Sequence, residues 1–146
     1  MDVIMNGKYN HTLDPKGRVS IPSQLRKKLG DAFYITVSSE DCLVGYTAEG
    51  WKKFNRWLDK ADDDIAATYR GYSADCVIDA QGRAFIPLEL REYAALETNV
   101  VIRGNGDKME IWKAETFEER QKVTASRDRL AEYKKVLQEI KERDSE

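Results

Sequence analysis

The chain has too few histidines and cysteines for most catalytic and metal-binding chemistry. His11 is the only histidine among 146 residues, and the two cysteines, Cys42 and Cys76, match no metal-ligand spacing. Without a second histidine or a CxxC pair we expect no metal site. Without a serine–histidine or cysteine–histidine set we expect no enzyme. The glycines form no phosphate-binding loop, so we also expect no cofactor and no small-molecule substrate.

The same scarcity leaves simple structural roles for these three residues. We expect both cysteines to be free, half-buried thiols in a reducing compartment. We expect His11 to be a polar residue on a strand beside a turn.

Long apolar runs are also missing. No stretch approaches the roughly 18 apolar residues that a transmembrane helix needs, so no membrane span is expected. The first ten residues, MDVIMNGKYN, lack the basic and apolar regions of a secretory signal. We therefore expect a cytoplasmic protein.

Neither sign of charge dominates the chain, whose formal net charge is −2. This balance argues against a purely electrostatic nucleic-acid binder, but net charge can conceal a local patch. The first 30 residues carry six basic residues against two acidic ones, namely Lys8, Lys16, Arg18, Arg26, Lys27 and Lys28 against Asp2 and Asp14. The N-terminal region is thus a basic segment of a mildly acidic protein.

What the chain does have is an internal repeat of about 65 residues. Residues 14–26 read DPKGRVSIPSQLR, and residues 79–91 read DAQGRAFIPLELR. Seven of the thirteen positions are identical: Asp14/Asp79, Gly17/Gly82, Arg18/Arg83, Ile21/Ile86, Pro22/Pro87, Leu25/Leu90 and Arg26/Arg91. We expect a first repeat over residues 5–60, a linker over 61–71, a second repeat over 72–117 and a C-terminal helical extension over 118–146.

Each copy contains a tight turn. In the first copy, Asp14, Pro15 and Gly17 supply the acceptor, the fixed φ and the positive φ that such a turn uses. In the second copy, Asp79 and Gly82 keep the two positions that the geometry needs most. The pattern predicts a type I turn followed by a glycine bulge, joining two antiparallel strands. An arginine, Arg18 or Arg83, follows immediately and should project from the base of the loop in a fixed direction.

Around each turn the pattern predicts strand, strand, short helix, strand, strand and helix. The expected strands are 8–13, 19–21, 33–37 and 43–46 in the first repeat and 84–86, 100–103 and 109–112 in the second, with hairpin loops at 38–41 and 104–108. Pro22 and Pro87 start the short helices 23–29 and 88–95, and Gly30 ends the first of them.

Three longer helical segments complete the expectation. The closing helix of the first repeat places Trp51, Phe54, Trp57 and Leu58 on one face, as core residues. A linking helix begins at Asp62, Asp63 and Asp64 and carries Ile65 and Tyr69. The last helix runs unbroken from 114 to about 143, with an apolar stripe of Leu130, Tyr133, Leu137 and Ile140. This stripe either folds onto its own chain or contacts another subunit.

The phrase HTLDPKGRVSIP at residues 11–22 resembles the opening signature of the MraZ family of bacterial transcriptional regulators. DAQGRAFIPLELREYA at 79–94 and EIW at 110–112 are similar to its second copy, so the resemblance covers most of the chain. It implies an α+β, β-rich fold: two tandem AbrB-like (SpoVT-AbrB) units packed as a double swapped-hairpin β-barrel, with short helices and a longer C-terminal helix.

The resemblance also implies a function. Family members form ring-like homo-oligomers, bind short G-containing direct repeats in double-stranded DNA, and usually repress the division and cell-wall operon that contains their own gene. A nucleoid-associated location follows. The first half departs from the family after its short helix, where Ser38, Ser39, Glu40 and Asp41 replace a glycine-rich stretch. This departure leaves the oligomer geometry open.

Carried over by position, the family's DNA-contacting arginines fall on Arg18 and Arg83, with Lys16 and Gln81 on the same loops. Arginine can bond guanine O6 and N7 together, whereas lysine suits phosphate, so we assign Lys16 and Lys8 mainly to phosphate. Arg26 and Arg91 lie on the short helices. They either reach phosphate or form a structural ion pair with Asp14 or Asp79.

Two other interpretations stay open. The turns could serve only to stabilise a hairpin, with no ligand. The chain could also be an antitoxin-like protein-interaction module of the AbrB/MazE type, although such modules usually carry one unit and a disordered tail. Because one chain offers few cationic contacts, DNA binding would need several units acting together along repeated sites.

Overall fold

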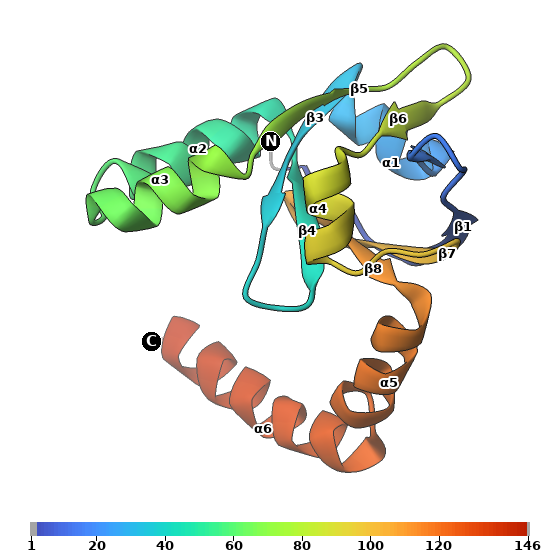
Figure 1. The fold of residues 1–146 in the computed structure, drawn as a ribbon. Helices are drawn as coiled ribbons and strands as arrows, with labels where there is room; N and C mark the ends of the chain where they lie inside the picture. The colour runs from blue at the N-terminus through green and yellow to red at the C-terminus, as the bar shows by residue number, and fades with distance from the viewer. Residues whose placement is uncertain (1–2, 146) are drawn as a thin grey trace. The chain divides into compact units, whose positions relative to one another are not determined.

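The computed structural model describes residues 3–145, over which the chain forms eight strands and six helices (Figure 1). The first half contains β1 (Lys8–Thr12), β2 (Arg18–Ser20), α1 (Ser23–Leu29), β3 (Ala32–Val37), β4 (Cys42–Tyr46) and α2 (Ala48–Leu58). The second half contains β5 (Ala74–Val77), β6 (Arg83–Phe85), α4 (Leu88–Tyr93), β7 (Asn99–Asn105), β8 (Lys108–Lys113) and α5 (Ala114–Thr124). Between them lies α3 (Asp63–Gly71), and α6 (Arg127–Asp144) comes last. The predicted order of elements therefore occurs twice.

The two halves exchange strands. One antiparallel sheet has the order β1-β7-β8-β4-β3-β5, and β2 pairs with β6 in a separate two-stranded ribbon. Strand β1 lies against β7, with Tyr9 opposite Ile102, and β5 lies against β3, with Cys76 opposite Phe33. Each half therefore lends its first strand to the other half's hairpin. The α+β, β-rich fold built from tandem repeats is confirmed.

The exchange gives both repeats one hydrophobic core. Leu25 and Leu90 each bury all but 1–2% of their surface there, a burial worth about 1.5–3 kcal/mol per leucine. Matched positions of the two repeats contribute together: Val19, Ile21 and Leu25 from the first, and Ala84, Ile86 and Leu90 from the second. Residues up to Ala114 form one compact unit, and those from Glu115 form a second. The domain limits given above remain predictions.

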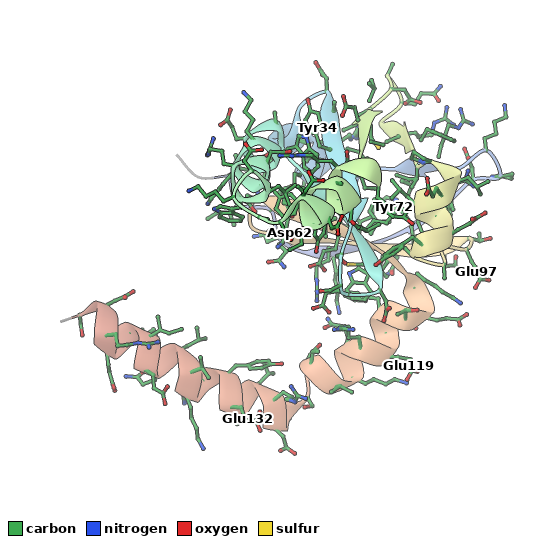
Figure 2. All side chains as sticks on the ribbon, turned by 60° about the vertical axis from the view of Figure 1, so that its left-hand side comes forward. Tyr34, Asp62, Tyr72, Glu97, Glu119 and Glu132 are labelled. Carbon is green, nitrogen blue, oxygen red and sulfur yellow. The ribbon has the colours of Figure 1, made fainter. Side chains whose placement is uncertain are left out.

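The predicted unbroken C-terminal helix is wrong. Helix α5 ends at Thr124, and α6 begins after Ser126, whose hydroxyl accepts a hydrogen bond from the Arg129 amide at 3.3 Å. Serine is a preferred N-cap residue because it satisfies such an amide. Side chains project from α6 along its length (Figure 2, where Glu132 marks the helix), and none of the residues of α6 is buried.

Helix α2 corrects a second expectation. Leu58 is buried, and Trp51 and Phe54 are half-buried in an aromatic cluster with Tyr46. Trp57 is 59% exposed and lies against Lys53 instead. Consecutive helical residues point about 100° apart, so Trp57 falls outside the face that Leu58 buries. The linking helix α3 begins where expected, after the N-cap residue Asp62. It packs beside α2 (Figures 1 and 2). Its Ile65 side chain is exposed.

Strand β7 continues through Gly104 and Asn105, which were expected to be loop. The reason is the N-terminal segment, because Gly104 N–H donates to the Gly7 carbonyl at 2.8 Å and Met5 pairs with Gly106. A β-carbon on Gly104 would meet the backbone of Met5 at 2.7 Å, so only glycine allows this approach. Met5 itself is 1% exposed and belongs to the core.

Both cysteines are free, as expected, but fully rather than half-buried. Burial raises the pKa of the Cys42 thiol to about 11 and that of Cys76 to about 12. His11 lies half-buried on β1, where burial lowers the pKa of its imidazole. Among the described residues, no helix combines the length and apolarity needed to cross a membrane.

Candidate nucleic-acid interface

The first turn is closed by the backbone and by the carboxylate of Asp14. The Gly17 amide donates to the Asp14 carbonyl at 2.9 Å, and the Asp14 amide donates to the Arg18 carbonyl at 2.9 Å. Asp14 Oδ1 accepts from the amides of Lys16 and Arg18, both at 2.9 Å. Gly17 has φ +84°, a conformation that glycine adopts without strain. Pro15 and Lys16 form the exposed tip.

The second turn repeats this arrangement. Asp79 accepts from the Gly82 amide at 2.9 Å through its carbonyl, and from the amides of Gln81 and Arg83 at 2.9 and 3.0 Å through Oδ1. Gly82 has φ +81°. Gln81 lies at the exposed tip, in the place that Lys16 has in the first turn.

The ribbon of β2 and β6 brings the two arginines onto one face. Arg18 lies opposite Phe85, and Ser20 lies opposite Arg83. Opposite residues of an antiparallel pair share a face, and alternate residues point the other way. Val19 and Ala84, at 1% exposed, face the core. Arg18 and Arg83 are therefore diagonal neighbours on the outer face, a relation that places α-carbons about 7–8 Å apart.

Each arginine is held by the aspartate of its own turn. Arg18 Nε donates to Asp14 Oδ2 at 2.8 Å, and Arg83 Nε lies 3.5 Å from Asp79 Oδ2. The Arg18 amide, with the guanidinium adding to it, lowers the pKa of the Asp14 carboxyl. The Arg83 amide does the same for the pKa of Asp79. Both side chains remain 31% exposed, so the ion pairs orient the guanidinium groups without removing them from the surface.

Lys8 is not brought to the turns. It occupies the first position of β1, in register with Arg103 of β7. A strand advances about 3.4 Å per residue, so the six residues from Lys8 to Asp14 correspond to about 20 Å of chain. The structure therefore places Arg18 and Arg83 on one ribbon, Lys16 and Gln81 on the turns at its two ends, and Lys8 on the separate six-stranded sheet.

The structure contradicts one of the two alternatives predicted for Arg26 and Arg91, and it does not test the other, contact with phosphate. The ion pairs with Asp14 and Asp79 proposed for them are wrong, because within residues 3–145 each carboxylate pairs with the arginine of its own turn. Arg91 lies over Gly17 and Arg26 lies over Gly82, each on the turn of the opposite repeat. The repeat itself carried a signal for this contact, because a glycine and a later arginine are preserved together in both copies.

A hollow of about 560 Å³ lies away from this face. It is lined by parts of α3, α4 and the β3–β4 hairpin, namely Val37, Ser38, Ser39, Asp64, Ile65, Thr68, Tyr69 and Tyr93. Among its described lining residues, Asp64 is charged and the serines, Thr68 and the two tyrosines carry hydroxyl groups. None of the residues predicted to contact DNA is among them.

The comparisons with known proteins agree with the repeat. A family model described as "MraZ protein, putative antitoxin-like" matches residues 4–70 and, a second time, residues 71–135. The chain belongs to the MraZ family. The MraZ resemblance of the two turn motifs is thereby confirmed.

Three relatives show the extent of the similarity, and each bears the name "Transcriptional regulator MraZ". The protein of Heliobacterium modesticaldum is 40% identical over 134 residues, 86% of this chain and 93% of the relative. That of Lactiplantibacillus plantarum is 41% identical over 133 residues, 86% and 94% of the two chains. That of Ligilactobacillus salivarius is 42% identical over 118 residues, 77% and 82%. By this shared name the three relatives are transcription regulators, and proteins of that class are typically non-enzymatic.

Proposed function

We propose that the chain is a sequence-specific DNA-binding regulator that reads the major groove with the β2–β6 ribbon and its two turns. The observation that carries this proposal is the placement of Arg18 and Arg83 on one exposed face of one ribbon. The major groove is about 12 Å wide and admits a two-stranded ribbon. Diagonal arginines about 7–8 Å apart suit bases about two steps apart along a strand that rises about 3.4 Å per step.

Guanine is the base that this pair would select. A guanidinium can bond O6 and N7 of guanine at once, a contact worth about 1–3 kcal/mol of discrimination. Lys16, at the tip of the first turn, would contact phosphate as a point charge. Gln81 occupies the matching tip without a charge. This chemistry agrees with the short G-containing repeats that the family resemblance implies.

Several copies would have to act together. One ribbon offers few cationic contacts on a chain of net charge −2, so its affinity for a single site would be low. Linked binding units gain affinity through effective concentration. This requirement would be met by a homo-oligomer, ring-like as the family resemblance implies, that binds direct repeats in the operator.

Helix α6 supports assembly by its pattern. Leu130, Tyr133, Leu137 and Ile140 form an apolar stripe whose members are all 37–57% exposed. At 3.6 residues per turn, basic residues border both sides of this stripe: Arg127, Lys134 and Lys141 on one, Arg129 and Arg143 on the other. Two such helices paired with each other would place like charges together. The stripe is therefore better suited to a different surface of a neighbouring copy, and contacts of that type form a ring when the rotation between copies closes.

Assembly can be tested on its own. Light scattering of Leu130→Glu plus Leu137→Glu should show a smaller particle than the wild type. Lys135→Glu, on the far side of α6, should leave the particle size unchanged. A wild-type monomer, or an oligomer that survives the double change, would refute this contact.

By the family resemblance, the regulated promoter is that of the division and cell-wall operon containing the chain's own gene, and the effect is repression in a cytoplasmic, nucleoid-associated setting. The antitoxin-like function is the second candidate, because the matching family description contains that term. Stoichiometric co-purification with a toxin, together with no DNA selected, would favour it.

The deciding experiment selects DNA from a random pool and then measures binding of the recovered site. We expect Arg18→Ala plus Arg83→Ala to abolish specific binding while circular dichroism stays unchanged. Lys52→Ala plus Arg56→Ala on α2 removes the same charge and should bind as the wild type does. Undiminished affinity of the Arg18/Arg83 variant would refute the assignment.

A further inference from the structure

We propose that Arg26 and Arg91 are positioning residues for the DNA-reading turns, and that each acts on the turn of the opposite repeat. This inference rests on the proposed function of those turns. It assigns the two helix arginines to the protein's own backbone rather than to phosphate. It also makes each turn depend on the half of the chain that does not contain it.

The contact lies at the turn glycines. A β-carbon on Gly17 would fall 2.8 Å from Cζ and 2.9 Å from Nη2 of Arg91, so the guanidinium occupies the space that any other residue would need. A β-carbon on Gly82 would fall 2.8 Å from Cζ of Arg26 and closer still to its Nη1. Each guanidinium thus covers a glycine whose positive φ shapes the turn.

A second contact joins the same partners. The Ile86 amide donates to the Gly17 carbonyl at 2.8 Å, and the Ile21 amide donates to the Gly82 carbonyl at 2.8 Å. Each turn glycine is therefore fixed twice by the opposite repeat, at its carbonyl by an isoleucine amide and over its α-carbon by an arginine. The residue after each glycine is the DNA-reading arginine, so its direction follows from how firmly the glycine is held.

The local structure aims these guanidinium groups. Proline starts each short helix, and the Arg26 and Arg91 amides bond the carbonyls of Pro22 and Pro87 at 2.9 and 3.0 Å. Arg91 is also fixed at its far end, because its Nε donates to the Ile86 carbonyl at 2.7 Å and its guanidinium lies 5.7 Å from the centre of the Phe85 ring. A lysine could supply the charge at this place but not a flat group that covers a glycine.

The Nε end of the Arg26 side chain lies inside the protein. Its Nε is buried and has no hydrogen-bond partner among the described residues. A buried donor left unsatisfied costs stability, and water or phosphate would satisfy it if the side chain pointed outward. Within residues 3–145, the guanidinium to which this buried Nε belongs lies against Gly82.

The first test needs no DNA. Amide hydrogen exchange of Arg91→Lys should show faster exchange, by about tenfold, at the first turn, which lies in the opposite repeat. Arg26→Lys should do the same at the second turn, and Lys27→Arg, on an exposed neighbour, should change neither. Unchanged exchange, or faster exchange in the variant's own repeat alone, would overturn the proposal even if DNA binding itself is disproved.

The second test uses the glycines. In Gly82→Ala the new β-carbon displaces the Arg26 guanidinium, so adding Arg26→Ala should cost little more. The loss of Tm in that double variant should be smaller than the sum of the single losses. Gly82→Ala with Arg91→Ala, the mismatched pair, should be additive. Additivity in both pairs would contradict the contact; if Gly82→Ala does not fold, the exchange test decides.

The third test separates positioning from phosphate contact. With the selected DNA, Arg26→Lys and Arg91→Lys should lose about tenfold in discrimination between that site and a guanine-to-adenine variant. Arg26→Gln should leave the slope of log affinity against log salt unchanged, whereas losing a phosphate contact would reduce it by about 0.9. A reduced slope with intact discrimination would make these arginines phosphate ligands instead.

Discussion

The two turns share a sequence pattern but are held unequally. In the first turn the Asp14 carboxylate accepts three hydrogen bonds, two from amides and one from Arg18 Nε at 2.8 Å. In the second turn Asp79 accepts two from amides, and Arg83 Nε lies 3.5 Å away and makes no hydrogen bond to any residue that the structure describes. Arg18 is therefore oriented by its own turn, and Arg83 is oriented less firmly.

The arginine that each turn receives from the opposite repeat is also held more firmly at the first turn than at the second. Arg91, over the first turn, is fixed by a carbonyl and an aromatic ring. Arg26, over the second turn, has a buried Nε that finds no hydrogen-bond partner within residues 3–145, and Ser20 stands at the position equivalent to Phe85. The tips differ too, since Lys16 carries a charge and Gln81 does not. The two repeats thus share one framework. The first turn is held by more contacts and has the charged Lys16 at its tip, whereas the second is held by fewer and has the uncharged Gln81.

The largest expected effect is on affinity. A side chain already held in its binding geometry loses less conformational entropy on binding, so Arg18 should contribute more than Arg83. We expect Arg18→Ala to weaken operator binding by about 10- to 100-fold and Arg83→Ala by about fivefold. Titrations of both variants against one operator measure this difference. Equal losses would mean that the unequal anchoring has no consequence for binding.

The seven identities of the repeat each have a structural reason, which is why so much could be predicted. Aspartate closes the turn, glycine supplies its positive φ, and the first arginine projects from the ribbon. Isoleucine and leucine enter the shared core, and proline starts the helix. Only for the second arginine was one prediction, the ion pair with an aspartate, wrong, because its guanidinium lies over the glycine of the other repeat. Local patterns define a turn, but they do not say which distant segment packs on it.

The remaining errors have the same origin. The sequence around Met5 and Gly7 shows no strand pattern. These residues nevertheless lie against the end of β7, because Gly104 has no side chain to block their backbone. Trp57 was predicted to be a core residue because it is apolar. It is exposed because Leu58 and Phe54 occupy the buried face of α2. Ser126 interrupts an otherwise helical stretch because its cap competes with continuation of the helix. Each depends on tertiary contact or on a single side-chain bond.

A smaller effect should follow from the charge at the tips. Lys16→Gln makes the first tip like the second, and Gln81→Lys makes the second like the first. Each phosphate contact changes the slope of log affinity against log salt by about 0.9. We expect Lys16→Gln to reduce the slope by about that amount and Gln81→Lys to increase it. Lys60→Gln, away from the ribbon, is the control, and a slope unchanged in all three would show that neither tip reaches phosphate.

The smallest effect concerns the aspartates and pH. The pKa of each carboxyl is lowered, chiefly by the amide of the arginine that ends its turn. A carboxylate with a lowered pKa stabilises the folded state above its ordinary pKa, and this contribution is lost as pH falls below about 4 through the folded-state pKa. At pH 7, Asp14→Asn should therefore lower Tm more than Asp79→Asn, because Asp14 alone also bonds its arginine. Below pH 4 the Tm of the wild type should approach the Tm of both variants. If the Tm of Asp14→Asn stayed below that of Asp79→Asn in acid, ionisation of Asp14 would not be what distinguishes the first turn.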